Sequence, residues 1–180
     1  GRPDIFLTDL VRDTFSLFVN QGKGFFLDRT FPSGIGSASV AHSGWSNKFL
    51  DIDNDGWKDI FVAGSHVVDN VALYSPAAKY EEGCFLYRNL GEGRFRDVAA
   101  EAGIVERTPG YGLGVRLLDH DGDGRLDIFV GNDSTENFLF HNLGGGRFEE
   151  VGVRSGVATN YDGATQATMG IALGDVDGNG

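Results

Sequence analysis

Short apolar runs alternate with clusters of glycine and acidic residues along the whole chain, and no segment shows a helical spacing of apolar positions. Residues 45–50 alternate between apolar and polar positions, residues 59–63 are a brief apolar run, and residues 85–89 alternate again before residues 95–98. A period of two is typical of a β-strand. The pattern therefore predicts four short strands joined by turns.

The same pattern recurs, and an Asp-rich motif marks each copy. Residues 51–62 read DIDNDGWKDIFV and residues 119–130 read DHDGDGRLDIFV. Residues 175–180, DVDGNG, begin a third copy, and residues 1–7, GRPDIFL, have the form of the second half of another. Repeats at this spacing indicate a fold built from one supersecondary unit.

A second landmark follows the Asp-rich motif in each copy. Residues 17–26 read LFVNQGKGFF, residues 86–95 read LYRNLGEGRF, and residues 139–148 read LFHNLGGGRF. The Asn and Gly positions tolerate positive φ, as a hairpin between two strands requires.

The predicted fold class is all-β: a β-propeller fragment of about three four-stranded antiparallel blades with Asp-rich calcium loops. The repeats are placed at residues 1–43, 44–110 and 111–168, with the start of a further repeat at 169–180. A propeller ring closes with roughly four to eight blades, so the remaining blades of the same propeller are expected as partners. Residues 67–83 are read as an insertion, either a recognition loop or a tolerated surface loop.

Composition narrows the possible partners. The chain carries a net charge of −11, which disfavours binding to a phosphate backbone, so no nucleic acid is expected. Its single cysteine, Cys84, excludes an intrachain disulfide. No apolar run approaches the length of a membrane span.

Acids at alternate positions, closed by a ninth-position Asp, suit calcium, which takes six to eight oxygen ligands at about 2.3 to 2.6 Å. The predicted ligands of the first loop are Asp51, Asp53, Asp55, the carbonyl of Trp57, and Asp59. Those of the second loop are Asp119, Asp121, Asp123, the carbonyl of Arg125, and Asp127. The partial copies contribute Asp4, Asp175, Asp177 and Asn179. The alternative is that these side chains form only Asx turns on a solvated edge.

Other candidate residues are assigned structural or surface roles. These are His42, His66, His120 and His141, which lack metal-ligand spacing, and Trp45 and Trp57, which suit blade packing better than sugar stacking. A formal glycosylation triplet begins at Asn132. No catalytic motif is found, so no enzymatic activity is expected.

The repeats resemble the FG-GAP or VCBS repeats of integrin α-chain-like propellers. Within that class, residues 44–50, Trp57 and residues 85–91 resemble the cartilage acidic protein family with its ASPIC/UnbV domain. The resemblance implies a seven-bladed, calcium-stapled propeller in a secreted or surface protein, with ligand recognition on loops opposite the ions.

The expected function is a calcium-binding extracellular scaffold for interaction or adhesion with a protein or carbohydrate. Loops of this kind in extracellular modules bind calcium at about 10⁻⁴ to 10⁻³ M, which favours an extracellular, cell-surface or periplasmic location. Two alternatives stay open: the propeller domain of a secreted polysaccharide lyase or hydrolase, and a spacer stalk.

Overall fold

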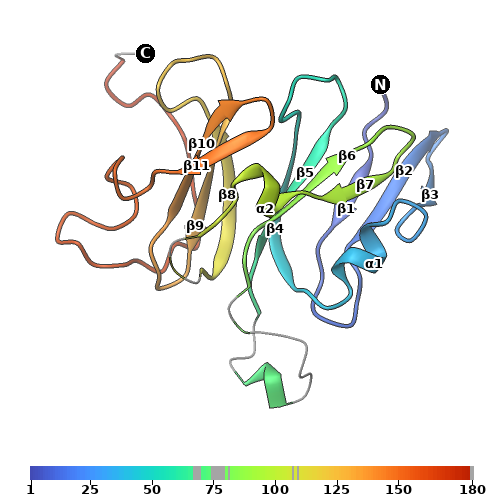
Figure 1. Cartoon of the computed structure of the whole chain (residues 1–180), viewed down its shortest axis with the longest axis horizontal. Coiled ribbons are helices and arrows are strands. Elements are labelled where there is room, and N and C mark those ends of the chain that lie inside the picture. Colours follow the sequence, from blue (N-terminus) through green and yellow to red (C-terminus); the bar gives the residue numbers. More distant parts are fainter. Residues whose placement is uncertain (67–69, 74–79, 81, 107, 109, 179–180) are drawn as a thin grey trace.

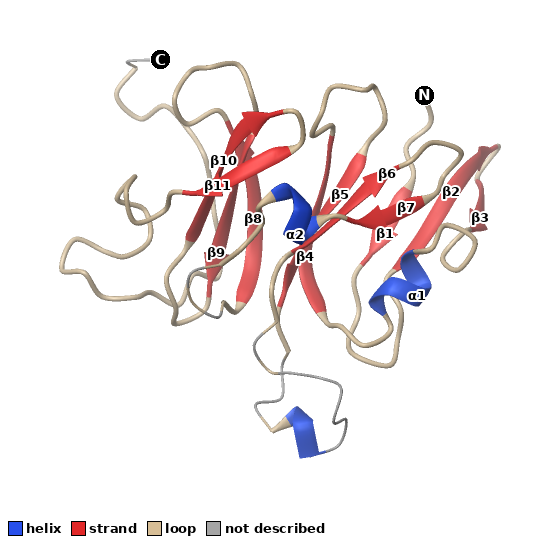
Figure 2. Ribbon diagram, viewed as in Figure 1, coloured by secondary structure: helices blue, strands red, loops and turns tan. Residues whose placement is uncertain are grey.

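Three antiparallel sheets lie side by side in chain order in this computed structural model (Figures 1 and 2). The structure describes residues 1–66, 70–73, 80, 82–106, 108 and 110–178. The first sheet contains β1 (Ile5–Leu7), β2 (Ser16–Gly22) and β3 (Phe25–Asp28). The second contains β4 (Gly44–Leu50), β5 (Asp59–Gly64), β6 (Phe85–Asn89) and β7 (Phe95–Asp97). The third contains β8 (Gly112–Leu118), β9 (Asp127–Asn132), β10 (Phe138–Gly144) and β11 (Arg147–Glu150).

Each sheet is a meander in which consecutive strands are neighbours. The four strands expected in the middle repeat match β4 to β7, so the prediction of an all-β fragment of four-stranded blades is confirmed. The first sheet has three strands in this chain.

The middle sheet is covered on both faces. Along β5, Phe61 and Ala63 join the apolar cluster shared with the third sheet, while Ile60 and Val62 join the cluster shared with the first sheet. Successive side chains of a strand point to opposite faces, so a strand buried on both sides needs apolar residues at every position. This is why residues 59–63 read as a continuous apolar run.

The hairpin turns have the backbone conformation that the glycine pattern predicts. Between β6 and β7, Glu92 and Gly93 have φ values of 55° and 69°, and between β10 and β11, Gly145 and Gly146 have φ values of 62° and 73°. Two consecutive residues with positive φ match the twist of an antiparallel pair, which favours glycine there.

Two short helices depart from the purely extended pattern: α1 (Ile35–Ser39) and α2 (Ala99–Ala102). Each lies in a connection between sheets, as Figure 2 shows. In α2, the N–H of Gly103, at φ 80°, bonds to the carbonyl oxygens of Ala100 and Ala99 and ends the helix. Helices of four or five residues are too short for apolar spacing to reveal, which is why the sequence pattern did not predict them.

Two segments singled out in the sequence contribute no strand among the described residues. Within the predicted insertion 67–83, residues 67–69, 74–79 and 81 lie outside the described residues, and Val71–Leu73 is a 3₁₀ helix, η1. Residues 151–178 contain no strand, so the start of a further repeat at residue 169 stays a prediction. None of the described helices has the length and apolar character needed to cross a membrane.

Candidate metal centres

The first Asp-rich loop, residues 51–58, joins β4 to β5 and wraps around the side chain of Asp51. The N–H groups of Asp55 and Gly56 donate to the two carboxylate oxygens of Asp51, both at 3.1 Å. Gly56 has a φ of 88°, a conformation in which an L side chain is strained. The N–H of Trp57 then donates to Asp55 Oδ1 at 2.8 Å. These local bonds close the loop around the carboxylate of Asp51.

Asp59, at the ninth position, is almost fully buried and ties three segments together. Its Oδ2 accepts the N–H of Ile52 at 2.9 Å, and its Oδ1 accepts the N–H of Asn89 in β6 at 2.7 Å. Burial raises the pKa of Asp59 above its ordinary value, and the two amide hydrogen bonds oppose this only in part. The neighbouring carboxylates of Asp53 and Asp55 raise the pKa further. The loop therefore holds concentrated negative charge.

Three of the predicted ligands in this loop converge. One carboxylate oxygen each from Asp51, Asp53 and Asp59 lies within 4.8 Å of the others. Oxygens bound to one calcium ion are at most about 5 Å apart, so this group fits a single ion. Asp55 is not a member of the group.

Arg88 in β6 contacts the acids of the first loop, which the sequence analysis did not predict. Its Nη2 pairs with Asp53 and lies 3.9 Å from Asp55 Oδ2. The guanidinium thus offsets part of the loop's charge. Its position immediately before the landmark Asn89 is the signal that could have identified it.

The second loop, residues 119–126, repeats the same local bonds. Asp119 Oδ1 accepts the N–H of Gly122 at 2.8 Å, and Oδ2 accepts that of Gly124 at 2.9 Å. The hydrogen bond from Gly124, followed by the other loop amides, lowers the pKa of Asp119. Asp123 accepts the N–H of Arg125 at 2.8 Å and also pairs with its guanidinium.

The converging group differs in this loop. Oxygens of Asp119, Asp121 and Asp123 lie within 4.8 Å of one another. The ninth-position Asp127 belongs instead to a group with His120, Asp121 and His141, whose ligand atoms also lie within 4.8 Å. Asp121 belongs to both groups.

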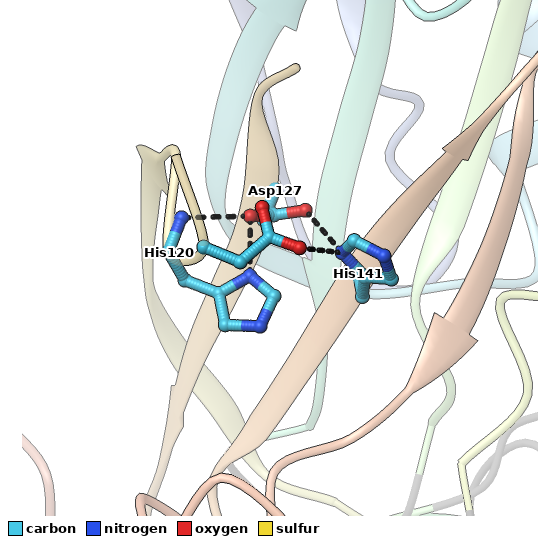
Figure 3. A group of neighbouring side chains, drawn as sticks. His120, Asp127 and His141 are labelled. Carbon is cyan, nitrogen blue, oxygen red and sulfur yellow. Dashed lines mark hydrogen bonds and ion pairs between the residues drawn. The ribbon is translucent and has the colours of Figure 1, made fainter. Parts of the chain in front are cut away.

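Asp127 is fully buried between two imidazole rings, as Figure 3 shows. Its Oδ2 lies 2.9 Å from the His120 backbone N and 2.6 Å from the His120 Nδ1. Its Oδ1 lies 2.7 Å from the Asn142 backbone N and 3.2 Å from the His141 Nδ1. Burial alone would raise the pKa of Asp127, but the hydrogen bonds from Asn142 and His120 outweigh it and hold the pKa below its ordinary value.

The partial motifs keep fragments of this geometry. Asp4 Oδ1 accepts the N–H of Asn20 at 2.8 Å, which is the bond that Asp59 and Asp127 make. Asp175 Oδ1 accepts the N–H of Gly178 at 2.7 Å, as Asp119 does from Gly122. Asp4, Asp175 and Asp177 join no converging group of three among the described residues, and Asn179 lies outside them.

The Asn of the second landmark brings the two landmarks into direct contact in each sheet. The Nδ2 groups of Asn20, Asn89 and Asn142 donate to the carbonyl that precedes the ninth-position Asp, at 3.0, 3.1 and 3.1 Å. Their Oδ1 atoms accept the N–H of the glycine two residues later, at 2.8, 2.9 and 2.9 Å. Each Asn therefore links the hairpin turn to the end of the Asp-rich loop.

A repeated antiparallel sheet with an Asp-rich loop between its first two strands defines a propeller-type repeat. The chain belongs to the FG-GAP-like repeat family, which matches residues 1–62, 51–130 and 119–180. The resemblance noted from the sequence is thereby confirmed.

Among curated proteins, the chain is similar to cartilage acidic protein 1. Identity to the Mus musculus protein is 40% over 85 residues, which is 47% of this chain and 12% of the relative. The Homo sapiens protein gives the same identity and coverage, and the Xenopus tropicalis protein is 36% identical over 84 residues. The matched region thus spans 12% of the length of these relatives.

Proposed function

We propose that this chain is part of an extracellular β-propeller that binds calcium in its Asp-rich loops and presents other loops to a protein or carbohydrate. The observation that carries the proposal is the convergence of Asp51, Asp53 and Asp59 within 4.8 Å. Carboxylate oxygens at this spacing form the ligand set that calcium prefers. The proposed ligands also include Asp55 and the carbonyl of Trp57.

Electrostatics supports a cation at this place. Two carboxylates about 4 Å apart repel each other by about 4 kcal/mol at an effective dielectric constant near 20. Burial is the main cause that raises the pKa of Asp59, and the charges of Asp53 and Asp55 raise it further, in the direction that such repulsion gives. A bound divalent ion attracts each carboxylate and outweighs this repulsion.

The second loop is proposed to bind calcium through the matching set of Asp119, Asp121, Asp123, the carbonyl of Arg125, and Asp127. The convergence of Asp119, Asp121 and Asp123 supports it. The partial loops are proposed to contribute Asp4 and, at the other end, Asp175, Asp177 and Asn179.

An extracellular location follows from the same chemistry. Calcium loops of extracellular modules have dissociation constants of about 10⁻⁴ to 10⁻³ M, which suit surroundings rich in calcium. The relatives are named for cartilage, which is consistent with a secreted protein.

Partner recognition is proposed at the end of the sheets away from the Asp-rich loops. The loop 51–58 joins β4 to β5, so the connection from β5 to β6 leaves the opposite end of the same sheet. In Figure 1 the short helix η1 (Val71–Leu73) of this connection lies apart from the sheets. Long loops on a rigid scaffold are a common place for recognition.

The proposal predicts calcium-dependent stability. Free calcium at about twenty times the dissociation constant stabilises a chain by about 1.8 kcal/mol per site. For a chain of this length, that raises the melting temperature by roughly 4 to 7 °C per loop. Thermal melts in calcium and in EGTA measure the shift.

Asp53→Ala is expected to lose part of the calcium-dependent shift, because it removes one of the converging oxygens. Asp162→Asn makes a similar charge change at an exposed residue outside the loops and is expected to keep the full shift. Equal melting temperatures in calcium and EGTA for the unaltered chain would contradict the proposal.

A further inference from the structure

We propose that His120, Asp121, Asp127 and His141 form a second kind of metal site, which takes zinc or a similar first-row transition-metal ion. The four residues come from the second Asp-rich loop and from β9 and β10, and one ligand atom from each lies within 4.8 Å of the others. The site lies beside the proposed calcium loop and shares Asp121 and Asp127 with it.

The geometry is close to that of a bound ion. The Nδ1 of His141 lies 3.2 Å from Asp127 Oδ1 and 3.7 Å from Asp121 Oδ2. Two ligands of a tetrahedral zinc ion, each about 2.0 to 2.1 Å from it, are roughly 3.4 Å apart. The Nδ1 of His120 lies closer to Asp127, 2.6 Å from its Oδ2, so ion binding requires the His120 side chain to rotate and open this hydrogen bond. The two rings approach edge to face with centroids 5.0 Å apart, so neither blocks the other (Figure 3).

The donor set selects the metal. Calcium takes oxygen ligands, whereas imidazole nitrogen suits zinc, copper, iron and nickel. Two imidazoles with two carboxylates match the mixed nitrogen and oxygen sets of protein-bound zinc. The side chains of His120 and His141 are 21% and 15% exposed, so an ion can reach them from solvent.

Comparison with the middle sheet shows that the imidazoles are not needed to hold the ninth-position Asp. Asp59 is buried like Asp127, and both of its oxygens accept backbone N–H groups without any histidine. The residues at the positions of His120 and His141 are Ile52 and Arg88. Both backbone hydrogen bonds to the ninth-position Asp are thus present in a sheet that lacks the two histidines. The two histidines add metal ligands to a structure that does not require them.

The middle sheet also defines the matched control variant. His120→Ile combined with His141→Arg places the residues of the first loop in the second, while every Asp of both loops is retained. The sheet geometry already accommodates this pair, since β6 carries Arg88 beside its own loop. His42→Gln, which removes a histidine paired with Glu82 outside the cluster, controls for the loss of any histidine.

The test is a titration of the 180-residue chain with Co²⁺, a spectroscopic probe for zinc sites, in calcium-free buffer, followed by competition with Zn²⁺. The unaltered chain and His42→Gln are expected to show the visible bands of a nitrogen-liganded ion and to lose them to Zn²⁺. The His120→Ile, His141→Arg chain is expected to bind at least about tenfold more weakly. Equal binding by this chain, or equal loss in His42→Gln, would overturn the proposal.

Thermal melts of the same chains in calcium and in EGTA distinguish the proposed zinc site from the proposed calcium sites. The His120→Ile, His141→Arg chain keeps its proposed calcium ligands, so its melting temperature is expected to rise with calcium as in the unaltered chain. A cobalt site without a calcium shift would contradict only the calcium proposal. A calcium shift in all chains without a cobalt site would contradict only the zinc proposal.

Discussion

Asp59 and Asp127 each have a structural role in addition to the metal-ligand role that the sequence predicted. Each was predicted as the ninth calcium ligand, and each also accepts backbone N–H groups from the start of its loop and from the third strand of its sheet. A buried amide without an acceptor destabilises the folded chain, so this structural role does not depend on a bound ion. Among the described residues, the backbone N–H groups that the other loop acids accept belong to their own loops.

Replacing Asp59 by Ala is therefore expected to destabilise the chain even without calcium. The buried amide of Ile52 and the partly buried amide of Asn89 lose their acceptor, at a cost of about 2 to 4 kcal/mol. Asp55→Ala, which removes the acceptor of the exposed amide of Trp57 and a half-exposed contact with Arg88, is expected to cost less than about 1 kcal/mol. Urea unfolding in EGTA measures both, and equal effects would show that Asp59 is not a structural brace.

The hairpins depend on backbone conformations that side chains restrict. In the turn between β6 and β7, Gly93 has a φ of 69°, and a Cβ added there would meet no atom within 4 Å. Any cost of adding a methyl group at Gly93 therefore comes from the backbone alone. The landmark Asn89 supports the same turn through its bonds to Lys58 and Gly91.

Gly93→Ala is expected to lower the free energy of unfolding by about 1 kcal/mol, because an L side chain is strained at positive φ. Gly174→Ala is the matched change at a residue without positive φ, also with nothing within 4 Å, and is expected to be neutral or slightly stabilising. The comparison is made by urea denaturation. A harmless Gly93→Ala would show that the turn relaxes to another conformation.

The sheets are coupled through close contacts across their faces. Gly112 at the start of β8 lies against Ala63 in β5, so that an added Cβ would be 2.8 Å from the Cβ of Ala63. Phe61 and Phe140, from the same two sheets, pack with ring centroids 6.1 Å apart. Interiors packed this closely leave no room for an extra methyl group, so the middle and third sheets are expected to unfold together.

Gly112→Ala tests this coupling and is expected to cost about 1 to 3 kcal/mol, because it forces β8 away from β5. Gly114→Ala, two residues further along β8, meets only the end of the Ile171 side chain and is expected to cost less. Adding Ala63→Gly to Gly112→Ala is expected to recover part of the loss, since it removes the opposing methyl group. Additive effects in urea unfolding would show that the two residues do not share the contact.

The repeat pattern was sufficient to predict the strands, the hairpin turns and the Asp-rich loops. These features depend on neighbours along the chain: alternation marks a strand, and glycine marks a positive φ. The bonds from Asp51 to the loop amides are likewise local, so the loop shape follows from its own residues.

The residues that complete each Asp-rich site could not be predicted from neighbours along the chain. Arg88 and His141 reach the Asp-rich loops from the third strand of their sheets, far along the chain from those loops. The two sites differ because this strand carries a guanidinium in one sheet and an imidazole in the other. Contacts between strands depend on pairing and side-chain direction across a sheet, which are properties of the folded chain and not of any short segment.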